Sequence, residues 1–205
     1  MRPMETIFRS STSKIDLGNG AVLTLWNDFL RDEAADALFG ALLNQIEWQR
    51  PRVNVFGREH PIPRFQYWMG DPDAKYRYSG LLLKPQEWHP SVQILREQIS
   101  AACQRTFNAT LINLYRDGAD KMGWHSDDEA ELGDSPWIAS FNLGSERTFA
   151  LRKQGKTRTE EQIELKHNQL LLMSPAVQQG WQHCVPQRKR ITQPRINMTF
   201  RRILS

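Results

Sequence analysis

RINMTFR, residues 195–201, alternates between polar and apolar side chains along its whole length. Successive side chains of a β-strand point to opposite faces, so one face of this strand would be polar and the other apolar. The polar face would carry Arg195, Asn197, Thr199 and Arg201. The pattern suits a strand between an apolar layer and a polar cavity, although an edge strand with a wet face shows the same alternation.

The chain after residue 109 has the same β character. Short runs rich in β-branched and aromatic residues are separated by turns. These runs are TLINLY (110–115), WIASFNL (137–143), RTFALR (147–152), QIELK (162–166) and QLLLM (169–173). No helix-length segment separates them, so βαβ crossovers are not expected. An antiparallel double sheet, either a sandwich or a jelly roll, is the natural closure.

The first half of the chain shows a helical period instead. After a strand pattern in AVLTLW (21–26), Ala34, Leu38, Leu42 and Ile46 recur every four positions and would share one helical face. Pro90 opens a second helix. The apolar face of that helix would carry Val92, Leu95, Ile99 and Ala102.

These patterns define one folding unit. Residues 1–14 are polar and aperiodic and predict a flexible tail. Residues 51–64 are rich in Pro and Arg and predict a shaped loop or a short hairpin. We therefore expect a single α+β domain over residues 15–205, with the N-terminal helices packed on one sheet of a β core.

The composition bears on the expected binding partner and cellular location. The 205 residues include 27 Lys and Arg against 23 Asp and Glu, a net charge of +4, which mildly favours an anionic partner. No apolar run is long enough to cross a bilayer, and the N-terminus lacks the apolar core of a signal peptide. The two cysteines form no disulfide framework, so we expect a cytoplasmic protein.

A candidate metal site lies in GWHSD, residues 123–127. His125 and Asp127 are two positions apart and can reach one ion, and His183 in GWQHCV would arrive from a distant strand. Two imidazoles and one carboxylate form the facial triad that leaves open positions on Fe(II). Taken alone, an HxD is also compatible with a solvated turn in which the Asp is a cap.

The polar strand faces add a second kind of signal. Arg195 and Arg201 lie six positions apart on one line, and Asn113 and Tyr115 share a face of another strand. A guanidinium grips a carboxylate with two charge-assisted hydrogen bonds. A 2-oxo dicarboxylic acid fits such a cavity, because it can chelate Fe(II) at one end and pair with Arg at the other.

The sequence resembles the AlkB family of Fe(II)/2-oxoglutarate-dependent dioxygenases, and looks most like the branch that repairs alkylated bases in duplex DNA. The resemblance extends from about Val53 to Leu204 and includes the HxD, the distal His and the RxNxTxR block in family order. Further shared motifs are VFG (55–57), SGL (79–81), INLY (112–115), HSDDE (125–129) and WQH (181–183). The resemblance implies a double-stranded β-helix, or jelly-roll, core.

The resemblance also implies residue roles at the reaction centre. The iron ligands would be His125, Asp127 and His183. The 2-oxoglutarate pocket would comprise Asn113, Tyr115, Arg195, Asn197 and Arg201. Arg195 would take the far carboxylate and Arg201 the end near iron. The cofactors implied are Fe(II), 2-oxoglutarate as co-substrate and O2.

Contacts to DNA follow from the same resemblance, many of them in a nucleotide-recognition region over about residues 50–90. An apolar finger that fills the gap left by a flipped base would comprise Val55, Phe56 and Gly57. Tyr78, beside Ser79, would stack on the target base, and Glu129 would read its exocyclic amine. A basic segment that touches the phosphate backbone would comprise Arg188, Lys189 and Arg190.

Further basic residues lie beside the finger and in a second stretch of the sequence. The flanks of the finger, Arg52, Arg58 and Arg64, suit a segment that lies between phosphates better than a core strand. A second basic stretch would form either a DNA contact or ordinary solvated surface, and it comprises Arg147, Arg152, Lys153, Lys156 and Arg158.

The implied activity is oxidative demethylation of N1-methyladenine and N3-methylcytosine in DNA, with base flipping and release of formaldehyde, succinate and CO2. The expected partner is alkylated, double-stranded DNA, and we expect a monomer that does not bind membranes. One alternative is an RNA, tRNA or single-strand demethylase of the same fold. Others are a nucleic-acid-binding module with a structural metal and a dioxygenase acting on protein or lipid, which the basic flanks disfavour.

Overall fold

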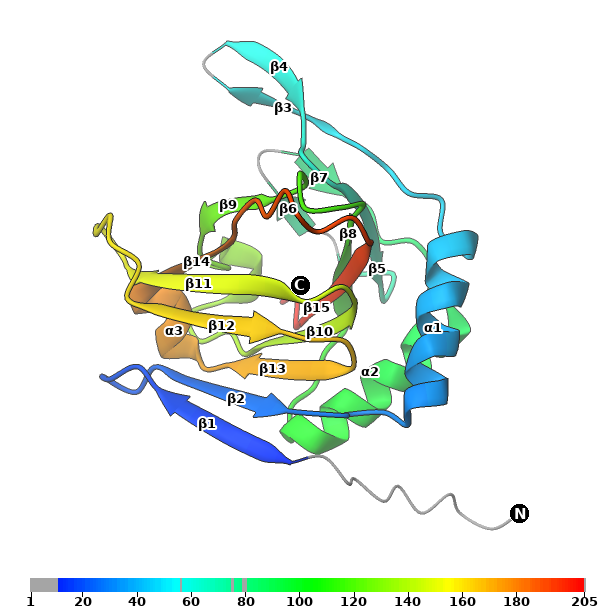
Figure 1. The fold of residues 1–205 in the computed structure, drawn as a ribbon, viewed down its shortest axis with the longest axis horizontal. Helices are drawn as coiled ribbons and strands as arrows, with labels where there is room; N and C mark the ends of the chain where they lie inside the picture. The colour runs from blue at the N-terminus through cyan, green and yellow to red at the C-terminus, as the bar shows by residue number, and fades with distance from the viewer. Residues whose placement is uncertain (1–10, 56, 75, 79–80, 205) are drawn as a thin grey trace.

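Two antiparallel sheets form the centre of the molecule (Figure 1). The computed structural model describes residues 11–204 with the exception of residues 56, 75, 79 and 80. The larger sheet has the order β1-β2-β13-β10-β15-β8-β5. Its strands are β1 (Thr12–Asp16), β2 (Val22–Trp26), β13 (Gln169–Met173), β10 (Ile138–Gly144), β15 (Arg195–Arg201), β8 (Ala109–Tyr115) and β5 (Phe65–Gly70).

The smaller sheet has the order β12-β11-β14-β9. Its strands are β12 (Glu161–Leu165), β11 (Arg147–Lys153), β14 (Trp181–Val185) and β9 (Met122–His125). A short helix, α3 (Pro175–Gly180), connects β13 of the larger sheet to β14 of the smaller one. This arrangement of two facing antiparallel sheets confirms the jelly-roll prediction.

Strand β15 lies inside the larger sheet, between β10 and β8, and all seven of its residues are buried. Its apolar face, with Ile196, Met198 and Phe200, belongs to the core under the helices. Its polar face lines a cavity between the sheets through Arg195, Asn197, Thr199 and Arg201. The alternation therefore marks a central strand with two different buried faces, and the edge-strand alternative is wrong.

Two apolar layers lie on opposite faces of the larger sheet. One lies between the two sheets and includes Leu111, Phe149 and Leu171. The other packs the larger sheet against α1 (Asp32–Gln45) and α2 (Pro90–Cys103), which confirms the helices on one sheet. Helix α1 buries Ala35 rather than the expected Ala34, since its buried face is centred on Leu38 and Leu42.

The tail boundary predicted from the sequence needs correction. Thr12–Asp16 forms β1 and pairs with β2 from Thr12↔Trp26 to Asp16↔Val22, so residues 12–14 are not part of a tail. The side chains of β1 are mostly exposed, because this edge strand is held by backbone hydrogen bonds rather than by apolar burial. Residues 1–10 of the expected tail lie outside the described residues.

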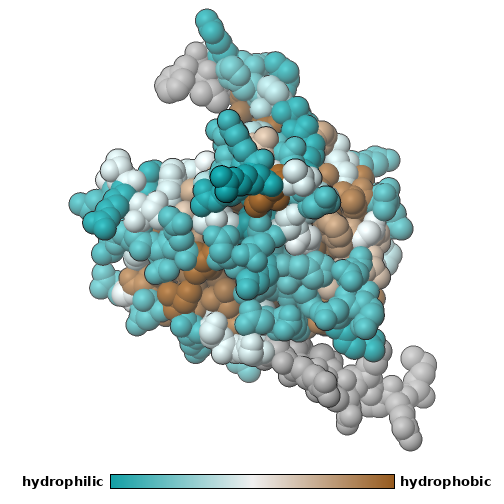
Figure 2. All heavy atoms as spheres, in the orientation of Figure 1, coloured by the Kyte–Doolittle hydropathy of each residue, from teal (hydrophilic) through white to brown (hydrophobic). Residues whose placement is uncertain are grey.

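The predicted nucleotide-recognition region, residues 50–90, contains two separate β-hairpins. They are β3 (Arg52–Val55) with β4 (Arg58–Pro61), and β6 (Tyr76–Tyr78) with β7 (Leu81–Leu83). The β3–β4 hairpin projects from the body of the molecule (Figure 1), and the surface around it is predominantly hydrophilic (Figure 2). Every residue of β4 is exposed. The short hairpin predicted as one option for residues 51–64 is therefore present.

None of the described helices is both long and apolar enough to span a bilayer.

Candidate metal and co-substrate site

Three side chains from two parts of the chain meet at the β9 edge of the smaller sheet. His125 ends β9 and is paired across the strands with His183 of β14, while Asp127 follows β9 by two residues. One ligand atom from each of these residues lies within 4.8 Å of the other two. Such spacing lets all three coordinate a single ion. The structure thus brings together the triad predicted from the sequence.

Hydrogen bonds hold these side chains in ligand geometry. His125 Nδ1 lies 2.9 Å from the carbonyl oxygen of Gly123 and, as the donor, leaves Nε2 available for a metal. The backbone N–H of Asp127 donates to Gln178 Oε1 at 2.9 Å, and Arg201 Nη2 donates to Asp127 Oδ1. Gln178 in α3 is buried and was not singled out from the sequence, because a lone Gln carries no ligand pattern.

Burial and neighbouring charge set the protonation state of the triad. Burial lowers the pKa of His183 to about 3, with the nearby His125 acting in the same direction. Burial also lowers the pKa of His125. For Asp127 burial alone would raise the pKa, but Arg201 and the two imidazoles outweigh it and lower the value to about 2. Neutral imidazoles beside an ionised carboxylate are the forms that bind a cation.

The predicted co-substrate residues line the same cavity as the triad. Arg195 is 1% exposed, its Nη2 donates to Asn142 Oδ1, and its guanidinium carbon lies 5.0 Å from the centre of the Tyr115 ring. Nε and Nη1 of Arg195 are buried without a hydrogen-bond partner. Because buried donors are normally satisfied, this guanidinium fits an anionic ligand such as the far carboxylate of 2-oxoglutarate.

Two amides complete the polar wall of this cavity. Asn197 Nδ2 donates to Ser140 Oγ at 2.7 Å, and Asn113 Oδ1 accepts a 2.8 Å hydrogen bond from Arg64 Nε. The two asparagines face each other across the β15–β8 ladder. All five residues predicted for the 2-oxoglutarate pocket therefore converge, with Ser140 and Arg64 as additional members of the polar network.

Two basic residues that were expected at the surface, whether or not they contact DNA, lie in the interior instead. Arg64 is 3% exposed and bonds Asn113, so it is not a surface flank of the finger. Arg147 is 1% exposed, because it has the same strand parity as the core residues Phe149 and Leu151. Of the rest of that stretch, Arg152 lies over the ring of Trp124 at 4.3 Å and Lys153 pairs with Glu160 at 3.6 Å.

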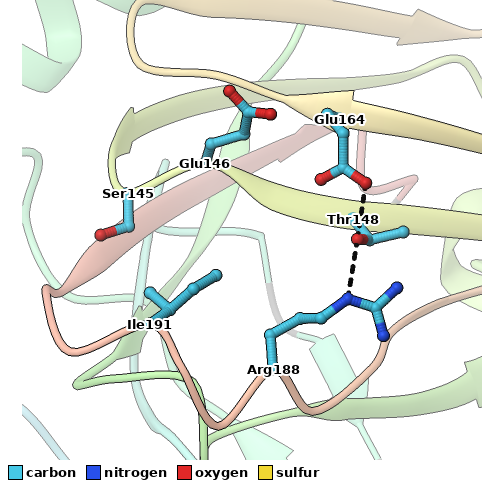
Figure 3. A pocket seen from close by; sticks show the side chains of 6 residues that line it. All are labelled: Ser145, Glu146, Thr148, Glu164, Arg188 and Ile191. Carbon is cyan, nitrogen blue, oxygen red and sulfur yellow. Dashed lines mark hydrogen bonds between the residues drawn. The ribbon is translucent and has the colours of Figure 1, made fainter.

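Arg188 lies on the outer face of the smaller sheet, where it lines an open hollow of about 410 Å³ (Figure 3). Its Nε donates to Thr148 Oγ1 at 3.1 Å, and that hydroxyl donates to Glu164 Oε1 at 2.7 Å. Lys189 and Arg190, which follow it, are exposed. The basic segment is thus accessible, but a carboxylate lies close to its first residue.

For most of the residues expected to contact the base, the structure describes no side chain. Phe56 and Ser79 lie outside the described residues, and the structure places Val55 and Tyr78 only as backbone in β3 and β6. Gly57 has φ +77° at the turn of the β3–β4 hairpin, a conformation that favours glycine. Glu129 is half-buried and precedes the 3₁₀ helix Ala130–Leu132. The base-contact roles stay predictions.

Comparison with known proteins agrees with this geometry. Residues 22–201 match the 2OG-Fe(II) oxygenase superfamily. The mouse protein named DNA oxidative demethylase ALKBH2 is 40% identical over 83% of this chain and 75% of its own length. The mouse alpha-ketoglutarate-dependent dioxygenase alkB homolog 3 is 37% identical over 87% of this chain and 65% of its own length. The solved structure described as "The structure of OsALKBH1" superposes with a TM-score of 0.64 at 15% identity, over 93% of this chain and all of that one, and supports the fold.

Fold, triad and superfamily match together define a 2-oxoglutarate-dependent iron oxygenase. Within that class, the chain belongs to the AlkB family of Fe(II)/2-oxoglutarate-dependent dioxygenases. The cofactors expected from the sequence, Fe(II), 2-oxoglutarate and O2, are those of this class.

Proposed function

We propose that this enzyme demethylates N-alkylated bases in DNA by oxidation, with N1-methyladenine and N3-methylcytosine as its substrates. The observation that carries the proposal is the convergence of the His125, Asp127 and His183 side chains with the buried, partly unsatisfied guanidinium of Arg195 in one cavity. The name DNA oxidative demethylase, which relatives at 39–40% identity bear, supports DNA as the substrate class.

The protein's own residues position the reactants. Bound Fe(II), with O2 and 2-oxoglutarate, supplies the oxidation of a methyl C–H bond. His125, Asp127 and His183 would hold the metal through two imidazoles and one carboxylate. Arg195 would orient the co-substrate through its far carboxylate, and Arg201 favours the ionised form of Asp127. The products of this oxidation would be the unmethylated base, formaldehyde, succinate and CO2.

Duplex DNA is the favoured form of the substrate. A base inside a duplex must be flipped out before its methyl group can reach the metal, at a cost of a few kcal/mol. The projecting β3–β4 hairpin supports a finger that enters the base stack, because Val55 and Gly57 border its turn and β4 is exposed throughout. The exposed Lys189 and Arg190 support contacts to phosphates.

Mass spectrometry of methylated oligonucleotides tests the proposal. Duplex and single-stranded DNA, together with matching RNA, are incubated with the protein, Fe(II), ascorbate and 2-oxoglutarate. We expect loss of the methyl group, equimolar formaldehyde and succinate, and faster repair of duplex DNA. The Asp127→Ala variant serves as the control without turnover. Faster repair of RNA than of DNA would show that RNA is the substrate instead. If no succinate forms, the protein is a nucleic-acid-binding module with a structural metal.

Two further expectations, the monomeric state and the cytoplasmic location, stay predictions.

A further inference from the structure

Arg147, at the start of β11, is a buried cation that the reaction described above does not use. Its guanidinium donates to three backbone carbonyls: Nη1 to Asp117 at 3.1 Å, and Nη2 to Asp120 at 2.8 Å and to Pro186 at 2.9 Å. The first two carbonyls belong to the loop between β8 and β9, and the third follows β14. A single side chain therefore ties together two loops that border the reaction centre.

The same side chain adds charge behind the co-substrate pocket. The guanidinium carbon of Arg147 lies 5.4 Å from the centre of the Tyr115 ring, and that of Arg195 lies 5.0 Å from the same ring. Among the described residues, neither guanidinium has a carboxylate within ion-pair distance. Two buried cations without a paired anion favour a dianionic ligand, since attraction between charges is strong where water is excluded.

The two loops also hold each other through their backbones. The N–H of Gly118 donates to Ile191 at 2.8 Å, and the N–H of Arg188 donates to Gly118 at 2.8 Å. A Cβ atom at position 118 would lie 1.8 Å from the carbonyl oxygen of Arg188, so only glycine permits this approach. The basic segment Arg188–Arg190 is thereby fastened to the loop that Arg147 holds from inside.

We propose that Arg147 is a positioning residue that joins the co-substrate pocket to the basic segment. Its charge strengthens 2-oxoglutarate binding through the wall formed by Tyr115, and its three carbonyl bonds fix the backbone that presents Arg188–Arg190. The effect on 2-oxoglutarate affinity requires only that the chain belongs to the AlkB family, whereas the effect on DNA affinity rests on the proposed function. The two effects are therefore measured separately.

The first measurement is 2-oxoglutarate affinity, by calorimetry on the Mn(II)-loaded protein without oxygen. Arg147→Gln should weaken binding by about tenfold, because it removes one of the two buried positive charges next to the Tyr115 ring. Arg147→Lys retains the charge and should stay within about threefold of wild type. Arg105→Gln is the matched control, because Arg105 also lies over an aromatic ring, that of Trp137 at 4.5 Å, away from the site. Unchanged affinity in Arg147→Gln, or equal losses in the Gln and Lys variants, overturns the role of the charge.

The second measurement is affinity for a methylated duplex, with metal and 2-oxoglutarate left out. Arg147→Lys should weaken DNA binding by about threefold to tenfold, because an ammonium group does not reproduce the planar fork that reaches three carbonyls. Gly118→Ala should weaken DNA binding similarly and leave 2-oxoglutarate affinity unchanged, and it remains informative if Arg147→Gln fails to fold. Wild-type DNA affinity in both variants overturns the anchoring role. If the wild-type protein does not bind methylated DNA, the proposed function is contradicted instead. The 2-oxoglutarate measurement still decides the role of the Arg147 charge in that case.

Discussion

At the scale of single residues, the metal site depends on side chains that are not ligands. Gln178 accepts the backbone N–H of Asp127, and Arg201 donates to the carboxylate of the same residue. Both partners are buried, so water cannot replace them readily when one is removed. The position of the Asp127 ligand is therefore set by an amide from α3 and a guanidinium from β15.

Replacing Gln178 by Leu should lower metal affinity by about tenfold to a hundredfold, because the Asp127 backbone loses the acceptor that fixes it. Calorimetric titration with Mn(II) measures this loss without turnover. Gln179→Leu is the matched control, since Gln179 is exposed and its side chain donates to the carbonyl oxygen of Asp134, away from the triad. Equal metal affinity in the two variants would show that Gln178 merely packs under the site.

Asp120 illustrates a residue whose ionisation supports a loop. It is 2% exposed and accepts hydrogen bonds from the backbone N–H, Nε and Nη2 of Arg116. Burial tends to raise the pKa of Asp120, but the hydrogen bonds from Arg116 prevail, and the net pKa is lowered. Ionised Asp120 therefore stabilises the folded protein above its unfolded pKa, and this contribution is lost as the pH falls through the lower folded value.

Asp120→Asn should therefore destabilise the protein at neutral pH by about 1–3 kcal/mol, the usual worth of hydrogen bonds to a charged group. Urea unfolding at pH 7 and at pH 3 measures the effect. The difference between variant and wild type should shrink at the lower pH, because the Asp120 carboxylate takes up a proton more readily in the unfolded than in the folded wild-type protein. A difference that is the same at both pH values would exclude ionisation of Asp120 as its source.

At the scale of elements, the β3–β4 hairpin belongs to neither of the two main sheets. It pairs only with itself, from Arg52↔Pro61 to Val55↔Arg58, and projects from the body (Figure 1). The ion pair between Arg52 and Glu59, at 3.3 Å, is exposed and adds little stability. An element that buries so little of its own surface is suited to contact a partner.

Phe56→Ala should reduce repair of duplex DNA far more than repair of single strands, because only a duplex needs a side chain to fill the gap left by the flipped base. Rates of methyl removal from matched duplex and single-stranded oligonucleotides measure this ratio. Thermal unfolding of the variant controls for stability. Equal losses on the two substrates would refute the finger and favour a general role in binding.

At the scale of the whole molecule, alternation and spacing predicted the reaction centre well. The polar–apolar pattern of RINMTFR placed β15 between a cavity and an apolar layer, as observed. His125, Asp127 and His183 converge as predicted. Strand β5 was missed, because the buried Gln66 interrupts its apolar pattern, and β1 was missed because backbone pairing leaves no periodic signal in an exposed edge strand.

Charge was the less reliable guide. Arg64 was expected beside the finger between phosphates, and Arg147 was expected either at a DNA contact or on solvated surface, because basic residues are usually exposed. Both are buried. For Arg147, its parity with Phe149 and Leu151 in RTFALR carried the correct signal. For Arg64, the sequence offered none, since its burial depends on Asn113 of a distant strand.

The placement of the reaction centre between the two sheets has a consequence for opening of the fold. The triad belongs to β9, β14 and the turn after β9, whereas the arginines predicted to hold 2-oxoglutarate belong to β15 of the other sheet. A metal and co-substrate bound together would span both layers and resist their separation. Amide hydrogen exchange in β14 should then slow markedly only when both are present. The metal and co-substrate needed for the reaction would in that case also stabilise the packing of the two sheets.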